Sequence, residues 1–134
     1  MKYFIDTCYI VALYQKNDLL HSKAKLLKAS LSSTDELCTT EAILLEIGNS
    51  LSHPRFRKDV ALFLQSAYQD PSLNLILLET PLIQKGIERF SKRLDKQWGL
   101  IDCISFIVME KYNIKKALTS DTHFEQAGFQ ILLK

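Results

Sequence analysis

The chain has 134 residues, of which 47% are hydrophobic and 24% are charged, and its formal net charge is +2 at pH 7. This composition excludes an intrinsically disordered chain, because it supplies enough apolar surface to offset the entropy lost on folding. No apolar run approaches the roughly 20 residues of a membrane-spanning helix, and an acid at Asp6 comes too early for a signal peptide. We therefore expect one globular, cytoplasmic domain over residues 1–134 that does not contact a membrane.

Hydrophobic periodicity and turn residues divide the first half of the chain into alternating elements. Asn17 and Asp18 are typical of a break between two helices, and Thr40 is a favourable residue to cap the start of another. A histidine and a proline at 53–54 mark the end of that helix. In chain order we expect a strand, two helices, a strand and two helices, over residues 2–5, 8–15, 21–31, 36–39, 40–52 and 58–68.

The second half continues the same alternation. Pro81 suits the first turn of a helix, and Gly128 suits the position just past the end of one. We expect a strand, two helices, a strand, a short helix and a last strand, over residues 73–79, 81–92, 102–112, 116–120, 122–126 and 129–133. Strands that alternate with helices are typical of an α/β domain with a mostly parallel sheet covered by helices.

Four carboxylates are expected at one edge of this sheet. Asp6 and Asp121 directly follow predicted strands, and open α/β sheets bind ligands beyond the carboxyl ends of their strands. Asp102 lies in the first turn of a helix that starts near the same edge. Glu46 lies beside the apolar stripe of the helix over 40–52, so its side chain should be partly buried next to open space.

Each of these acids also has a plain structural interpretation. Asp6, Asp102 and Asp121 stand where an acid caps a helix or stabilises its first turn, and a cap contributes about 0.5–2 kcal/mol. Glu46 could be an ordinary surface residue. Capping does not explain why four carboxylates converge, however, since they repel one another unless their pKa values rise or a cation gathers them. Oxygen ligands of this kind select Mg²⁺ or Mn²⁺ over zinc, and the number of ions stays open.

Other residues near these acids have two interpretations each. The hydroxyl groups of Thr7, Ser105 and Ser120 could orient a carboxylate or a water, and capping or core packing is an equal alternative. His123 could touch the substrate, but we favour a structural or solvent-facing role, because metal-assisted chemistry needs no histidine base. The three cysteines have no metal-binding spacing, and we expect small buried side chains in a reducing compartment.

Two basic segments could bind the phosphates of a nucleic acid such as RNA. One contains Arg55, Arg57 and Lys58, and the other contains Arg89 and Arg93, which share a helix face. Phe90 and Trp98 near the second segment could offer flat faces for bases, although such charge runs are more often solvated helix faces. A helix corner with four apolar or aromatic residues could receive a protein partner, or could belong to the core: Leu13, Tyr14, Leu19 and Leu20.

Four segments of the chain resemble, in order, the motifs of one family. They are residues 4–7 with the sequence FIDT, 39–49 with TTEAILLEIGN, 95–105 with DKQWGLIDCIS, and 117–121 with ALTSD followed by His123 and Phe124. Each motif alone is weak, but together they cover essentially the whole chain. The chain resembles PIN-domain proteins, specifically the VapC-like toxin ribonucleases of bacterial toxin–antitoxin pairs.

This resemblance implies a PIN-like three-layer α/β/α fold and metal-dependent cleavage of RNA by an activated water. Asp6 and Asp102 would be the most direct ligands of Mg²⁺ or Mn²⁺, and Glu46 and Asp121 would complete the catalytic cluster. The resemblance also implies an RNA substrate, a cognate antitoxin protein and a homodimer. It leaves the RNA target and the cleavage site open.

Two other functions compete with that of a nuclease. A phosphate-accepting receiver domain needs an aspartate at the end of its central strand, but the apolar segment 73–78 ends in Glu79 and Thr80. A PIN-fold module that binds RNA or a protein without cleavage stays open, although the complete set of acids argues against it.

Overall fold

The computed structural model describes all 134 residues, and its strands form one parallel sheet. Along the sheet the order is β3-β2-β1-β4-β5, and every neighbouring pair is parallel. The predicted parallel α/β sheet is therefore confirmed. The strands are β1 (Lys2–Ile5), β2 (Glu36–Thr40), β3 (Leu73–Ile76), β4 (Lys116–Leu118) and β5 (Gln130–Ile131).

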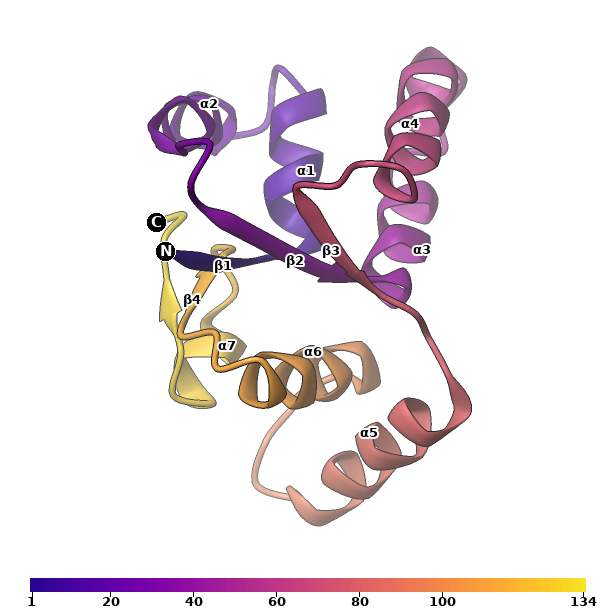
Figure 1. Cartoon of the computed structure of the whole chain (residues 1–134), viewed down its shortest axis with the longest axis vertical. Coiled ribbons are helices and arrows are strands. Elements are labelled where there is room, and N and C mark those ends of the chain that lie inside the picture. Colours follow the sequence, from indigo (N-terminus) through magenta and orange to yellow (C-terminus); the bar gives the residue numbers. More distant parts are fainter.

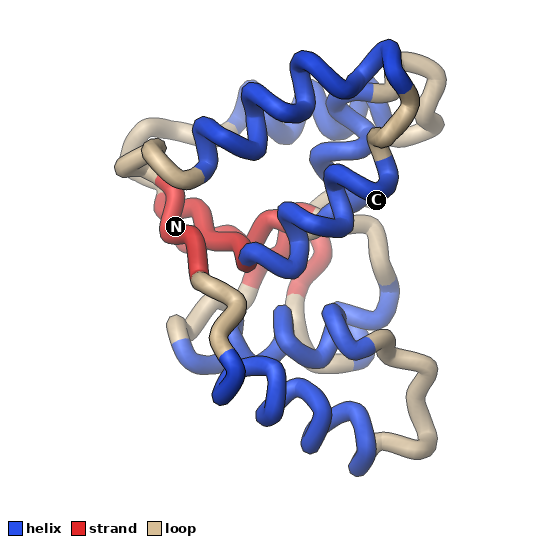
Figure 2. The backbone as a smooth tube through the Cα atoms, turned by 90° about the vertical axis from the view of Figure 1, so that its right-hand side faces the viewer, coloured by secondary structure: helices blue, strands red, loops and turns tan.

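Helices cover both faces of the sheet and complete the three layers (Figures 1 and 2). Parallel sheets need this cover, because their crossover connections carry helices and both faces are apolar. No helix has the length and apolar character that a membrane span requires. One face carries α1 (Thr7–Tyr14), α2 (His21–Ser30), α3 (Glu41–Ser50) and α4 (Pro54–Ala67), and the other carries α5 (Thr80–Lys92), α6 (Leu100–Lys111) and α7 (Thr122–Gln126).

Several predicted boundaries were wrong. Helix α4 begins at Pro54 instead of residue 58, because proline is favoured in a first turn and His53 Nδ1 accepts the Arg55 N–H at 3.2 Å. The strands over 73–79, 116–120 and 129–133 are each shorter than predicted. Strand β3 ends at Ile76 because its partner residue Thr40 is the last residue of β2, after which the chain turns into α3.

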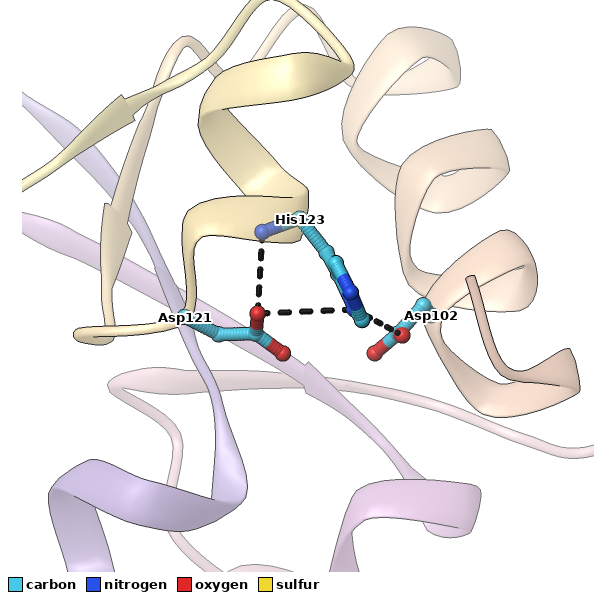
Figure 3. Close-up of side chains that lie close together, drawn as sticks. All are labelled: Asp102, Asp121 and His123. Atoms are coloured by element: carbon cyan, nitrogen blue, oxygen red, sulfur yellow. Dashed lines mark hydrogen bonds and ion pairs between the residues drawn. The ribbon is translucent and has the colours of Figure 1, made fainter. Parts of the chain in front are cut away.

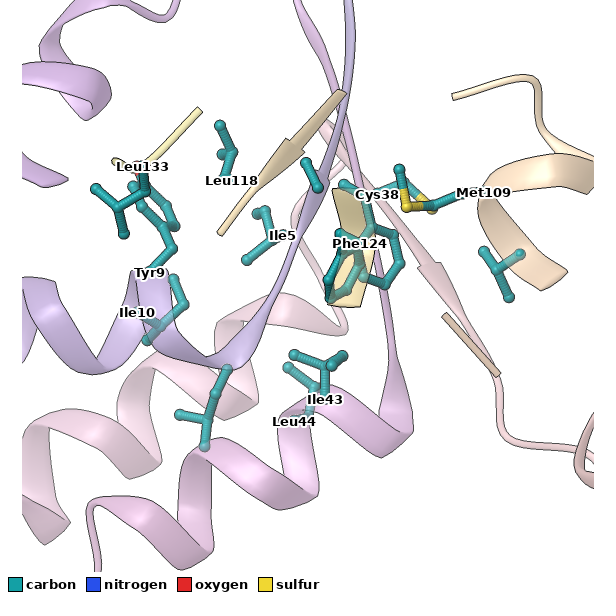
Figure 4. Packing of buried hydrophobic residues seen from close by; sticks show 14 of the residues in the cluster. Ile5, Tyr9, Ile10, Cys38, Ile43, Leu44, Met109, Leu118, Phe124 and Leu133 are labelled. Carbon is teal, nitrogen blue, oxygen red and sulfur yellow. The ribbon is translucent and has the colours of Figure 1, made fainter. Parts of the chain in front are cut away.

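An aromatic cluster fixes the helices of one face to the sheet. Phe124 of α7 is fully buried, and its ring lies 6.2 Å from that of Phe4 in β1 and 5.0 Å from that of Phe106 in α6 (centroid distances). Figure 4 shows Phe124 among other buried side chains of the sheet and helices. Trp98 packs edge-on against Phe106 at 5.1 Å and is only 6% exposed. The suggestion that Trp98 offers an open face to RNA bases was therefore wrong.

Two helical glycines should respond oppositely to the same substitution. A Cβ at Gly86 in α5 would lie 2.6 Å from Ile104 Cγ1 of α6, whereas a Cβ at Gly48 in α3 would lie 3.6 Å from Leu64 Cδ1. We expect Gly86→Ala to lower the free energy of unfolding by about 1–3 kcal/mol through overpacking. Gly48→Ala should raise it by up to about 1 kcal/mol through helix propensity. Urea unfolding measures both, and equal signs would contradict the close packing of α5 on α6.

Candidate active site

The site lies where the strand order reverses. From the central strand β1 the chain passes to β2 and β3 on one side, and later to β4 and β5 on the other. Ligands of open α/β sheets bind at this switch point, beyond the carboxyl ends of the two strands. Because Ile5 pairs with Leu118, the residues that follow, Asp6 and Thr119, leave the sheet side by side.

Asp6 is a buried carboxylate, with 7% of the residue exposed. Thr119 Oγ1 donates a hydrogen bond to Asp6 Oδ2 at 2.7 Å. Burial raises the pKa of Asp6 to about 6, the hydrogen bond from Thr119 opposes this, and the nearby Asp102 and Glu46 charges add to it. Asp6 precedes α1, but its side chain makes no capping hydrogen bond. Helix capping therefore does not account for this acid.

Each of the other three acids accepts a hydrogen bond from a nearby group. Thr7 Oγ1 donates to Glu46 Oε1 at 2.6 Å, and the Gly99 N–H donates to Asp102 Oδ2 at 3.0 Å. Asp121 Oδ1 accepts the His123 N–H at 2.9 Å and so caps α7. Asp102 and Asp121 thus do stabilise the starts of their helices. The hydrogen bonds involved use one oxygen of each carboxylate, and the second oxygen has no protein partner.

All four carboxylates line one open cleft of about 400 Å³. The structure therefore brings these four carboxylates together at the carboxyl edge of the sheet. Asp18, in the connection between α1 and α2, also lines this cleft and was not identified from the sequence. Its Oδ1 accepts the Leu20 N–H at 2.8 Å, so the turn residues at 17–18 were a signal for a local turn and not for a place in the cleft.

The three hydroxyl residues singled out from the sequence have different surroundings. Thr7 holds Glu46, as described. Ser120 Oγ lies 3.6 Å from Cys8 Sγ, and both residues line the cleft. Ser105 is fully buried and its hydroxyl group has no hydrogen-bond partner.

Thr119 was missed by sequence reasoning, although it holds the most buried of the four acids. Its hydroxyl group also accepts the Asp121 N–H at 3.0 Å and lies 3.1 Å from Cys8 Sγ. One threonine therefore connects Asp6 with the segment that carries Asp121. Only the register of β1 against β4 reveals this position, and a single sequence does not specify that register.

His123 lies between two of the acids (Figure 3). Its Nδ1 is 3.1 Å from Asp102 Oδ2 and 3.5 Å from Asp121 Oδ1. Asp102, Asp121 and His123 each offer one ligand atom, and these atoms lie within 4.8 Å of one another. The sequence analysis favoured a structural or solvent-facing role for this histidine, whereas the structure places its imidazole beside the carboxylates.

The basic residues proposed for RNA binding lie outside the carboxylate cleft. Arg89 makes a two-pronged ion pair with Glu110 at 2.8 and 2.7 Å. Arg93 pairs with Asp95 and lies over the Trp98 ring at 4.8 Å, and both arginines line a separate cleft of about 580 Å³. At the start of α4, Arg55 stacks on Phe56, Arg57 donates to Ser52 O, and Lys58 is exposed.

Comparison with known proteins identifies the family. The family model described as the PIN domain matches residues 3–130. The chain belongs to the PIN-domain family. Its fold is similar to that of VapC20 from Mycobacterium tuberculosis, described as a sarcin-ricin loop cleaving toxin, with a TM-score of 0.83, 26% identity and 95% of each chain covered. No curated protein sequence matches the chain at a significant level.

Two further solved structures share the fold at lower identity. FitAcB from Neisseria gonorrhoeae has a TM-score of 0.69 at 13% identity, with 97% of this chain and 96% of that chain covered. VapBC2 from Rickettsia felis, bound to a DNA fragment from their promoter, has a TM-score of 0.62 at 13% identity, with 98% and 97% covered. The PIN chain is thus VapC-like, and its family supports a nuclease as the class of activity.

The donor set of this PIN chain fits a divalent cation. Five of the eleven residues that line the cleft are acidic. Hard cations such as Mg²⁺ and Mn²⁺ prefer such oxygen ligands. Asp6 is buried near the charges of Asp102 and Glu46, with a threonine hydroxyl group as its hydrogen-bond donor. A cation would neutralise this repulsion, and Asp6, Asp102, Glu46 and Asp121 are the residues that could hold it.

Substitution of Asp6 should stabilise the metal-free protein at neutral pH. The folded state holds the Asp6 proton up to a pKa of about 6, whereas the unfolded state releases it near 3.8, so stability falls as pH rises between these values. We expect the free energy of unfolding of Asp6→Asn to exceed that of wild type by about 2–3 kcal/mol at pH 7 in chelator. At pH 4 the two free energies should be nearly equal.

Urea unfolding at both pH values measures this difference. Asp59→Asn, on the exposed surface of α4, is the matched control and should show no such change with pH. A constant difference between wild type and Asp6→Asn across this pH range would contradict the burial of an ionised Asp6.

Proposed function

We propose that this chain is a Mg²⁺- or Mn²⁺-dependent endoribonuclease, a single PIN domain over residues 1–134 that acts as the toxin of a toxin–antitoxin pair. The observation that carries the proposal is the buried carboxylate of Asp6 in a cleft with Glu46, Asp102 and Asp121. Burial of a charge beside like charges costs free energy and is expected where a cation or a reacting group compensates it.

The proposed site consists of ligands of the cation and of groups that hold those ligands in place. Asp6 and Asp102 are the proposed direct ligands, and Glu46 and Asp121 complete the cluster directly or through waters. When bound, a divalent cation activates a water for attack and neutralises charge on the phosphate. Thr119 and the Gly99 N–H fix one oxygen of Asp6 and Asp102, respectively, and Thr7 fixes Glu46. No side chain of the protein needs to act as the nucleophile.

RNA is the proposed substrate, acted on in the cytoplasm. VapC20, whose fold is similar over 95% of both chains, is described as a toxin that cleaves the sarcin-ricin loop. Arg55, Arg57, Lys58, Arg89 and Arg93 remain candidates for phosphate contacts on the surface outside the cleft. Because Arg89 and Arg93 are already paired with acids, their contribution to RNA affinity should be smaller than that of unpaired cations.

A cognate antitoxin and a second copy of the chain are the proposed protein partners. Leu19 at the corner between α1 and α2 is 99% exposed, and Leu13, Tyr14 and Leu20 beside it are half-buried. A neighbouring cleft of about 380 Å³ between α1 and α4 is lined by Tyr14, Phe56, Arg55 and Asp59, among others. An exposed apolar corner beside a cleft is suited to binding an amphipathic segment of another protein.

Replacement of Asp102 should abolish metal-dependent cleavage of RNA. Purified wild type, Asp102→Asn and Asp59→Asn are compared on total RNA with Mg²⁺, with Mn²⁺ and with chelator. We expect discrete fragments from wild type and Asp59→Asn only with metal, and a loss of more than about 100-fold in Asp102→Asn. Asparagine retains an oxygen for the Gly99 N–H, so the start of α6 should persist.

Folding of the variants is checked by circular dichroism. Cleavage that survives in chelator or in Asp102→Asn would contradict the site. A folded wild-type protein that is free of antitoxin and leaves the RNA intact would instead favour the non-cleaving binding module.

A further inference from the structure

His123 lies beside two carboxylates of the cleft, on a turn that is anchored to the core. It lies in the first turn of α7, next to Phe124, which is fully buried between the rings of Phe4 and Phe106. The backbone N–H of His123 donates a hydrogen bond to Asp121 Oδ1 at 2.9 Å, which fixes the backbone at this position. The imidazole is therefore presented to Asp102 by an anchored turn, and its side chain is 29% exposed.

The two distances from His123 Nδ1 to the neighbouring carboxylates match edges of a metal coordination sphere. Ligand atoms about 2.0–2.2 Å from one ion and at right angles to each other are about 3 Å apart. His123 Nδ1 lies 3.1 Å from Asp102 Oδ2 and 3.5 Å from Asp121 Oδ1. Figure 3 shows the imidazole directed between the two carboxylates. One ion could thus be held by all three side chains.

We propose that His123 is a nitrogen ligand of the catalytic cation, together with Asp102 and Asp121, and that this nitrogen makes the site prefer a first-row transition cation over Mg²⁺. The inference rests on the proposed function, because it assigns a ligand to that same site. Imidazole binds transition cations well, whereas Mg²⁺ favours oxygen ligands and waters. With four carboxylates and no nitrogen ligand, the preference for a transition cation over Mg²⁺ would be weaker.

The competing role is a hydrogen bond that only orients Asp102. In that role the Nδ1 proton points at Asp102 Oδ2, and any donor at the same position would serve. In the ligand role Nδ1 has no proton and presents its lone pair to the ion. His123→Asn separates the roles, since the asparagine amide restores a donor near the Nδ1 position but offers no imidazole nitrogen.

The test measures cation binding by the full chain without RNA. Wild type, His123→Asn, His123→Ala and His53→Asn are titrated calorimetrically with Mn²⁺ and with Mg²⁺. Bound Mn²⁺ is also examined by electron spin-echo spectroscopy, which detects directly coordinated nitrogen. His53 lies outside the site at the start of α4 and accepts the Arg55 N–H, a role that asparagine can keep, so His53→Asn is the matched control.

We expect a nitrogen signal from wild type and His53→Asn and none from either His123 variant. In both His123 variants the affinity for Mn²⁺ should fall about tenfold, and the affinity for Mg²⁺ should change much less. Mn²⁺ bound without a nitrogen signal, or Mn²⁺ affinity restored by asparagine, would overturn the inference and leave the proposed nuclease intact. A wild-type protein that binds neither cation would instead overturn the proposed function itself.

Discussion

The parallel pairing of β1 with β4 is the constraint on which the site depends. The pairing of Ile5 with Leu118 places Asp6 next to Thr119 as the two strands end. The 2.7 Å hydrogen bond between them holds the Asp6 carboxylate in a buried position, where desolvation disfavours its charged form. Ionisation of Asp6 therefore costs free energy at this edge of the sheet, and a bound divalent cation would offset that cost.

The core positions the remaining acids around this point. Phe106 of α6 and Phe124 of α7 pack against each other and against the sheet. Trp98, just before α6, packs against Phe106. These contacts bring Asp102 at one helix start near Asp121 at another, although the two lie in separate segments of the sequence. Packing away from the cleft thus determines the distances between the side chains of the candidate site, so changes in the aromatic cluster should affect the site as well as stability.

The sequence contained enough information for the fold class and the general location of the site. Alternating strands and helices predicted the parallel sheet, and acids after the strands at Asp6 and Asp121 indicated its carboxyl edge. Boundaries were less predictable because they depend on partners and local capping: β3 stops where β2 stops, and α4 begins at Pro54 instead of residue 58. Trp98 was misjudged because burial of a lone aromatic residue depends on tertiary packing. Thr119 and His123 gained importance only from distances between segments.

The most direct test is the position of a cation in a crystal of the protein grown with Mn²⁺. Anomalous scattering locates Mn²⁺ independently of any assumption about its ligands. The account predicts a peak in the carboxylate cleft within coordination distance of Asp6 and Asp102. An ordered cleft without a peak, or a peak only at some other part of the surface, would contradict the claim that these carboxylates gather a catalytic cation.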